Sequence, residues 1–178
     1  MRVLVIYESM FGATKAVAQA IAAGIAVDGE TVVVRACEVT PEHLRGVDLV
    51  VVGAPTHIHG LPRPSTRRGT PGMVQKAGGD LVLEPGADTA SGVREWLAGL
   101  GELKTHAAAF DTRANGVAFF TGRASKRIAR ALKGHGATLV GSPESFLVAK
   151  AKLLPGELER AQAWGERLRS QITKVVER

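Results

Sequence analysis

The chain has 178 residues, of which 45% are hydrophobic and 22% are charged, and its formal net charge is +6. This length and composition are typical of one globular domain, and they exclude a disordered, collagen-like or coiled-coil chain. The single cysteine, Cys37, excludes an intramolecular disulfide and a cysteine metal cluster. We expect Cys37 to be a small buried residue at the end of a strand.

The first apolar run is short, because Glu8 and Lys15 follow it closely. A membrane-spanning helix needs roughly 20 apolar residues, and a secretory signal needs a longer apolar stretch than this one. The sequence therefore predicts a cytoplasmic protein without a membrane span.

The first part of the chain alternates between strand and helix patterns. Unbroken apolar runs rich in valine and isoleucine predict buried strands. Apolar residues at helical spacing predict a helix over 13–27, and Pro41 begins a helical turn over 41–44. The predicted strands cover 3–7, 31–36 and 47–54.

A long loop interrupts this alternation at residues 55–89, which contain five prolines. Loops of this length inside a compact domain are usually functional. No acidic residue occurs from Pro55 to Gly79, whereas four basic residues do: Arg63, Arg67, Arg68 and Lys76. We expect the arginines to form a positive rim that attracts an acidic protein or a small anionic substrate.

The alternation resumes in the second half with a helix over 92–100 and a strand over 106–111. A basic helix over 123–133 follows, and residues 138–148 contain a fifth strand. A closing helix spans 157–176, with Leu158 on its apolar stripe. Strands that alternate with helices predict a single doubly wound α/β domain, in which a parallel sheet has helices on both faces.

Ligands bind such sheets at the carboxyl ends of the strands, where the loops 8–13, 55–89 and 111–122 begin. The first of these loops leads directly into a helix, so its backbone N–H groups and the helix dipole favour an anion. Gly12 lets the backbone approach a phosphate, while Ser9 and Thr14 add hydroxyl donors. An ordinary helix cap at Ser9 or Thr14 remains the alternative. Neither the dinucleotide fingerprint nor the P-loop motif is present.

The segment Tyr7-Glu-Ser-Met-Phe-Gly-Ala-Thr14 resembles the phosphate loop of flavodoxin-like proteins. It is most similar to the S-M-Y-G-x-T form found in flavodiiron flavodoxin domains and related quinone reductases. Gly53-Ala-Pro-Thr56 resembles the G-x-P-T that follows the third strand in the same groups. The resemblance implies a five-stranded sheet of order 2-1-3-4-5 and an FMN cofactor. The FMN phosphate would lie on residues 9–14, and its isoalloxazine ring between the second and third loops.

The second loop lacks the aromatic residue that flavodoxins usually stack on the flavin. It contains His57 and His59 instead, which could contact the flavin, donate a proton or simply be solvated. In the third loop, Asp111 and Thr112 could hydrogen-bond a flavin edge, and Phe119 or Phe120 could stack on the ring or be buried. The candidate FMN-binding residues are Ser9, Met10, Phe11, Gly12, Ala13, Thr14, Pro55, Thr56, His57, Ile58, His59, Gly60, Asp111, Thr112 and Arg113.

The function predicted from these features is FMN-dependent electron transfer with a redox protein or a small anionic or quinone substrate. One alternative is a flavin-dependent quinone or protoporphyrinogen-type reductase, which would make the protein an FMN-dependent oxidoreductase. Another is a flavodoxin-fold interaction module with weak or no FMN binding. We expect no metal site, and no nucleic-acid partner because the basic residues are not interleaved with aromatic ones.

Overall fold

The computed structural model describes residues 1–26, 29–57, 60–116 and 121–176. Its strands are β1 (Arg2–Tyr7), β2 (Glu30–Arg35), β3 (Leu49–Pro55), β4 (His106–Ala114), β5 (Thr138–Leu139), β6 (Glu144–Ala149) and β7 (Lys152–Leu153). Its helices are α1 (Ala13–Ile25), α2 (Pro41–Leu44), α3 (Pro64–Arg68), α4 (Thr70–Lys76), α5 (Val93–Gly99), α7 (Ala124–Gly134) and α8 (Glu157–Val176), with a 3-10 turn at Ala36–Glu38. None of the described helices is long and apolar enough to cross a membrane.

The strands form one sheet of order β2-β1-β3-β4-β6-β7. The predicted parallel order is confirmed, but the expected fifth strand is divided. β5 pairs with the start of β4 and β6 with its end, because Gly141, in a left-handed conformation, and Pro143 separate the two. β7 then returns antiparallel to β6 and adds a hairpin that the sequence analysis did not predict.

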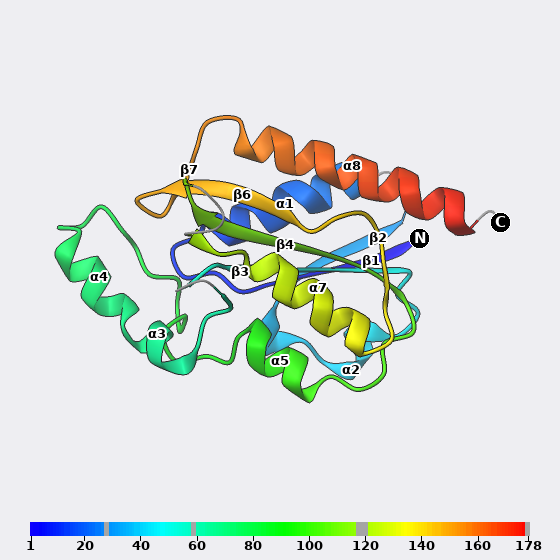
Figure 1. Cartoon of the computed structure of the whole chain (residues 1–178), viewed down its shortest axis with the longest axis horizontal. Coiled ribbons are helices and arrows are strands. Elements are labelled where there is room, and N and C mark those ends of the chain that lie inside the picture. Colours follow the sequence, from blue (N-terminus) through cyan, green and yellow to red (C-terminus); the bar gives the residue numbers. More distant parts are fainter. Residues whose placement is uncertain (27–28, 58–59, 117–120, 177–178) are drawn as a thin grey trace.

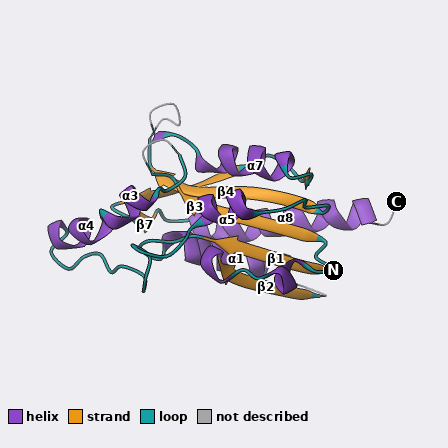
Figure 2. Ribbon diagram, turned by 90° about the horizontal axis from the view of Figure 1, so that it is seen from below, coloured by secondary structure: helices purple, strands orange, loops and turns teal. Residues whose placement is uncertain are grey.

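Helices cover both faces of the sheet, as expected for a doubly wound α/β fold. Helices α1 and α8 lie on one face, and α5 and α7 lie on the other (Figure 1). Helices α3 and α4 extend past the end of the sheet where the parallel strands finish (Figure 2). The chain therefore places its long connection beside the edge at which such folds bind ligands.

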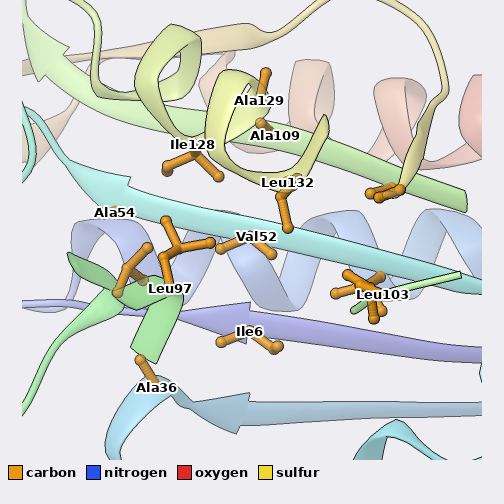
Figure 3. Close-up of a cluster of buried hydrophobic side chains, with 14 of the residues drawn as sticks. Ile6, Ala36, Val52, Ala54, Leu97, Leu103, Ala109, Ile128, Ala129 and Leu132 are labelled. Atoms are coloured by element: carbon orange, nitrogen blue, oxygen red, sulfur yellow. The ribbon is translucent and has the colours of Figure 1, made fainter. Parts of the chain in front are cut away.

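The core is divided between the two faces by the alternation of side chains along each strand. Ile6 of β1 and Val52 of β3 pack with Leu97 of α5 and Leu132 of α7 (Figure 3). On the opposite face three aromatic residues form a cluster, in which the rings of Phe110, Phe146 and Trp164 lie with centroids 6.2 to 6.4 Å apart in edge-to-face contact.

Two glycines allow α1 and α8 to pack backbone to backbone. A Cβ at Gly24 would overlap the carbonyl oxygen of Gln162, and a Cβ at Gly165 would overlap that of Ile21. The contact is reciprocal, since each glycine faces the other helix. α1 carries the first loop of the candidate site at its amino end, so this contact also fixes where that loop lies.

Several predictions for individual elements were wrong. β4 continues to Ala114 rather than ending at Asp111, and α3 and α4 lie within the predicted loop over 55–89. Cys37 is exposed, because the 3-10 turn after β2 carries it out of the core. Leu158 is 43% exposed, because it lies in the first turn of α8 where the helix begins beyond the core.

We expect Gly165→Ala to lower the free energy of unfolding by about 1–3 kcal/mol, because the added methyl forces α1 and α8 apart. Gly72→Ala in α4 is the control, since a Cβ there meets nothing within 4 Å. Alanine favours a helix over glycine, so the control should be neutral or up to about 1 kcal/mol more stable. Urea unfolding of both variants measures this, and a Gly165→Ala protein as stable as the parent would contradict the packing argument.

Candidate functional site

A pocket with about 630 Å³ of empty space, open to solvent, lies at the carboxyl edge of the sheet. The first loop, the ends of β3 and β4, and the β6–β7 hairpin enclose it, and α4 contributes one side chain. Its lining residues are Ser9, Met10, Phe11, Ala13, Thr14, Pro55, Thr56, His57, Met73, Thr112, Arg113, Ala114, Val148 and Ala151. This set includes most of the candidates selected from the sequence.

The amino end of α1 opens into this pocket without a side-chain cap. Gly12 has a φ of 89°, in the left-handed region, and its N–H donates to Ser9 Oγ at 3.1 Å. The first turn of α1 contains no acidic residue and its N–H groups have no side-chain acceptor. The helix end is thus suited to an external anion rather than satisfied within the chain.

One carboxylate approaches the same loop from the 55–89 segment. The N–H of Glu84 donates to the carbonyl of Met10 at 2.8 Å, which ties this segment to the loop. The Glu84 carboxylate lies 3.5 Å from Lys15 Nζ, and its Oε1 would lie 3.5 Å from a Cβ at Gly12. The lysine offsets the negative charge beside the helix end.

Hydroxyl groups connect the first loop to β4 beneath the pocket. Thr14 Oγ1 and Thr112 Oγ1 are hydrogen-bonded at 2.7 Å, and both residues are buried. The carbonyl of Thr112 accepts the N–H of Thr56 at 2.7 Å. Three segments distant in sequence are therefore held together by two short bonds at the floor of the pocket.

The second loop forms a tight turn between His57 and Gly60. The N–H of each residue donates to the carbonyl of the other, at 2.8 and 3.0 Å. Thr56 Oγ1 accepts the N–H of Ala124 at 3.0 Å and attaches the loop to the start of α7. Burial, together with the positive charge of Arg67, lowers the pKa of His57, so its imidazole is neutral at pH 7. Ile58 and His59 lie outside the described residues.

Asp111 does not face the pocket. It is fully buried, and its Oδ2 accepts the N–H of Ser125 at 2.7 Å at the start of α7. Because β4 continues through this position, Asp111 and Thr112 point to opposite faces, and only Thr112 lines the pocket. Burial raises the pKa of Asp111. Phe119 and Phe120 lie outside the described residues.

Arg113 lines the pocket and also braces the third loop. Its Nη1 donates to the carbonyl of Gly116 at 2.7 Å and to Thr121 Oγ1 at 3.0 Å. Gly60 does not line this pocket but an adjacent one, with His57 at the wall between them. No group of three or more potential metal ligands occurs in the part of the chain that the structure describes.

A buried ion-pair network was missed by the sequence analysis. Arg67 was expected on a positive rim, yet it is 3% exposed. Its Nη1 lies 3.2 Å from Glu8 Oε1 and its Nη2 lies 2.8 Å from Glu95 Oε2. Glu8 Oε2 also accepts the N–H of Val93 at 2.8 Å. The only sequence signal was the charge of Glu8 directly after a fully apolar strand, a position where a carboxylate needs a partner.

Comparison with known proteins identifies similar folds. A family model described as a flavodoxin domain matches residues 4–65, which include the first loop and the 55–60 loop. No curated protein matches the chain significantly in sequence.

Solved structures match almost the whole chain. A flavodoxin from Archaea has 20% identity and a TM-score of 0.67 over 97% of this chain and 99% of its own. A flavodoxin from Bacillus cereus has 18% identity and a TM-score of 0.65 over 96% and 98%. A flavodiiron core from Synechocystis has 18% identity and a TM-score of 0.64 over 98% of this chain but 36% of its own. The predicted resemblance to flavodoxin-like proteins is confirmed, and the fold is flavodoxin-like.

We expect Arg67→Ala to lower the free energy of unfolding by about 3 kcal/mol, because it leaves the buried Glu8 carboxylate without its cation. Arg68→Ala is the matched control, since Arg68 is the next residue and is exposed. The control should change stability by less than about 0.5 kcal/mol. Chemical unfolding at pH 7 compares the two variants, and equal losses would contradict the assigned network.

The loss of stability in Arg67→Ala should grow as pH rises above the usual carboxyl pKa. Burial raises the pKa of Glu8 even in the parent, and Arg67 opposes that rise. A carboxyl whose folded pKa exceeds its unfolded value costs stability as pH increases through that interval, because the fold disfavours the charged form. Without Arg67, the folded pKa of Glu8 rises further above its unfolded value, so stability is lost over a wider pH range. Unfolding curves at several pH values test this, and a pH-independent loss would contradict it.

Proposed function

We propose that this flavodoxin-like protein binds one FMN non-covalently in the pocket at the carboxyl edge and transfers electrons between redox partners. One observation carries the proposal. The uncapped amino end of α1, with Gly12 in a left-handed conformation, opens into a cavity at the ends of β3 and β4. The donor set suits a phosphate and the adjoining walls suit a planar ring, so the residues present fit FMN.

The first loop would hold the phosphate. The backbone N–H groups of the first turn of α1 supply donors, and Ser9 and Thr14 add hydroxyl groups nearby. The Thr14 hydroxyl is positioned by its bond to Thr112 Oγ1, so the loop does not have to rearrange to present it. A preformed site lowers the entropic cost of binding.

The walls beside the loop would hold the ring. Met10, Pro55, Met73 and Val148 supply apolar surface at the pocket. These side chains would contact a planar ligand and exclude water from its faces. Bound FMN would supply the redox chemistry, while the protein sets its position and electrostatic surroundings.

His57 would serve as a neutral hydrogen-bonding group at the ring edge. Its imidazole lines the pocket, and its lowered pKa keeps one nitrogen free to accept and the other able to donate at pH 7. The reciprocal backbone bonds with Gly60 fix the turn that carries it.

FMN should raise the melting temperature of the protein more than riboflavin does. A ligand that binds only the folded state stabilises it by about 2.7 kcal/mol at a hundredfold excess over Kd. Riboflavin lacks the phosphate and so gains nothing from the end of α1. Thermal unfolding with each ligand at equal concentration measures the difference, and equal shifts would argue against a phosphate site at residues 9–14.

Gly12→Val should weaken FMN binding by about tenfold or more, equivalent to about 1.4 kcal/mol. Valine is strained at a φ of 89°, so the loop must leave the conformation that meets the phosphate. Gly46→Val is the control, because Gly46 also has a positive φ, of 63°, but no atom lies within 4 Å of its Cβ position and it is remote from the pocket.

Both variants should lose some stability, but only Gly12→Val should lose affinity. Titration followed by quenching of flavin fluorescence, with circular dichroism to check the fold, separates the two effects. FMN binding with equal affinity to Gly12→Val and the parent would show that the phosphate loop is wrongly assigned.

A further inference from the structure

A second cavity, with about 520 Å³ of empty space that includes open solvent, adjoins the pocket, and His57 lines both. Three arginines from different parts of the fold converge on it. Arg63 immediately precedes α3, Arg94 belongs to α5 and Arg127 belongs to α7. The remaining lining residues are Gly60, Leu61, Ser65 and Thr66.

The positive charge of this cavity is not neutralised by the protein. None of the described lining residues is acidic. Among the described residues, Arg63, Arg94 and Arg127 form no ion pair, in contrast to Arg67, which meets two carboxylates. Three guanidinium groups around one cavity repel one another, and an anion that enters relieves that repulsion.

One of the arginines is held in place by the backbone of the second loop, and a second lies beside that loop. Arg94 Nε donates to the carbonyl of Pro62 at 2.9 Å and its Nη2 to that of Leu61 at 2.7 Å, so Nη1 is left for a ligand. Arg127 lies against Gly60, where a Cβ would come within 3.0 Å of its Nε. A side chain that is fixed as Arg94 is loses little conformational entropy when it binds a ligand.

We propose that this cavity binds the carboxylate or phosphate group of a small organic substrate whose other end reaches the FMN pocket. The planar fork of arginine matches both groups, with two parallel N–H donors for two oxygens. The two cavities share His57 as a lining residue, so a single molecule beside His57 can contact both. The concave shape favours a small molecule over a protein surface. The inference rests on the proposed function, because the FMN pocket gives the substrate its second contact.

The test compares two double variants of equal charge. Arg63→Ser with Arg127→Ser removes two cavity arginines but leaves Arg94, which supports the backbone. Arg68→Ser with Arg130→Ser removes two exposed arginines from α3 and α7 that do not line the cavity. The probes are 2-naphthoate, 2-naphthyl phosphate and the neutral methyl 2-naphthoate, titrated calorimetrically into the full chain with and without saturating FMN.

The parent and the control variant should bind at least one anionic probe about tenfold more tightly than the neutral ester. The cavity variant should lose that preference, with an unchanged circular dichroism spectrum and unchanged FMN affinity. Saturating FMN covers the first loop, so anion binding that persists reports the arginine cavity. The stronger anionic probe identifies the substrate as a carboxylate or a phosphate.

Equal anion binding by the two double variants would overturn the inference, and so would a parent that shows no preference for anions. The FMN titration tests the proposed function separately. If the cavity variant loses anion binding but the parent does not bind FMN, the anion site stands and the proposed function fails.

Discussion

The buried ion pair between Glu8 and Arg67 determines where the long connection after β3 lies. Glu8 directly follows β1 at the start of the first loop, and Arg67 belongs to α3, 59 residues later. Such pairs are costly to bury, so they often add positional specificity rather than stability. Here Glu8 also accepts the Val93 N–H, and a Cβ at Gly92 would overlap its carboxylate, so α5 is fixed at the same point. One carboxylate thus aligns α3 and α5 with the end of β1.

The arginines of this segment fall into two groups, one neutralised by carboxylates and one without such partners in the part of the chain that the structure describes. The charge of Arg67 is neutralised by two carboxylates and serves the fold. Arg63, four residues earlier, belongs to the same turn but has no such partner among the described residues and faces a cavity. His57 lies between these regions, where burial and Arg67 keep it neutral. A neutral group at the boundary lets a hydrogen bond form on either side without adding a fourth positive charge.

The sequence predicted the sheet and the first loop because both depend on local features. Valine-rich runs give strands, and Gly12 lies directly before α1 as expected, whereas the anion site there stays a prediction. It did not predict which side chains of the 55–89 segment are buried, because a charge pattern identifies arginines but not their partners. The direction of Asp111 was also missed. β4 extends through polar residues that lack the apolar signal of a strand, so a residue expected in a loop instead caps α7.

The net charge of +6 therefore describes the surface poorly. On α7, Lys126, Arg127 and Arg130 are all exposed, but only Arg127 lines the arginine cavity beside the second loop. Exposed charges of this kind are screened over about 10 Å at 0.1 M salt, and they act mainly on the rate of association. Charges that are partly buried, as Arg94 is, are screened less by salt. In the proposed anion site, ligand selection would accordingly depend on the three arginines that line the cavity, and not on the larger number that make the chain basic.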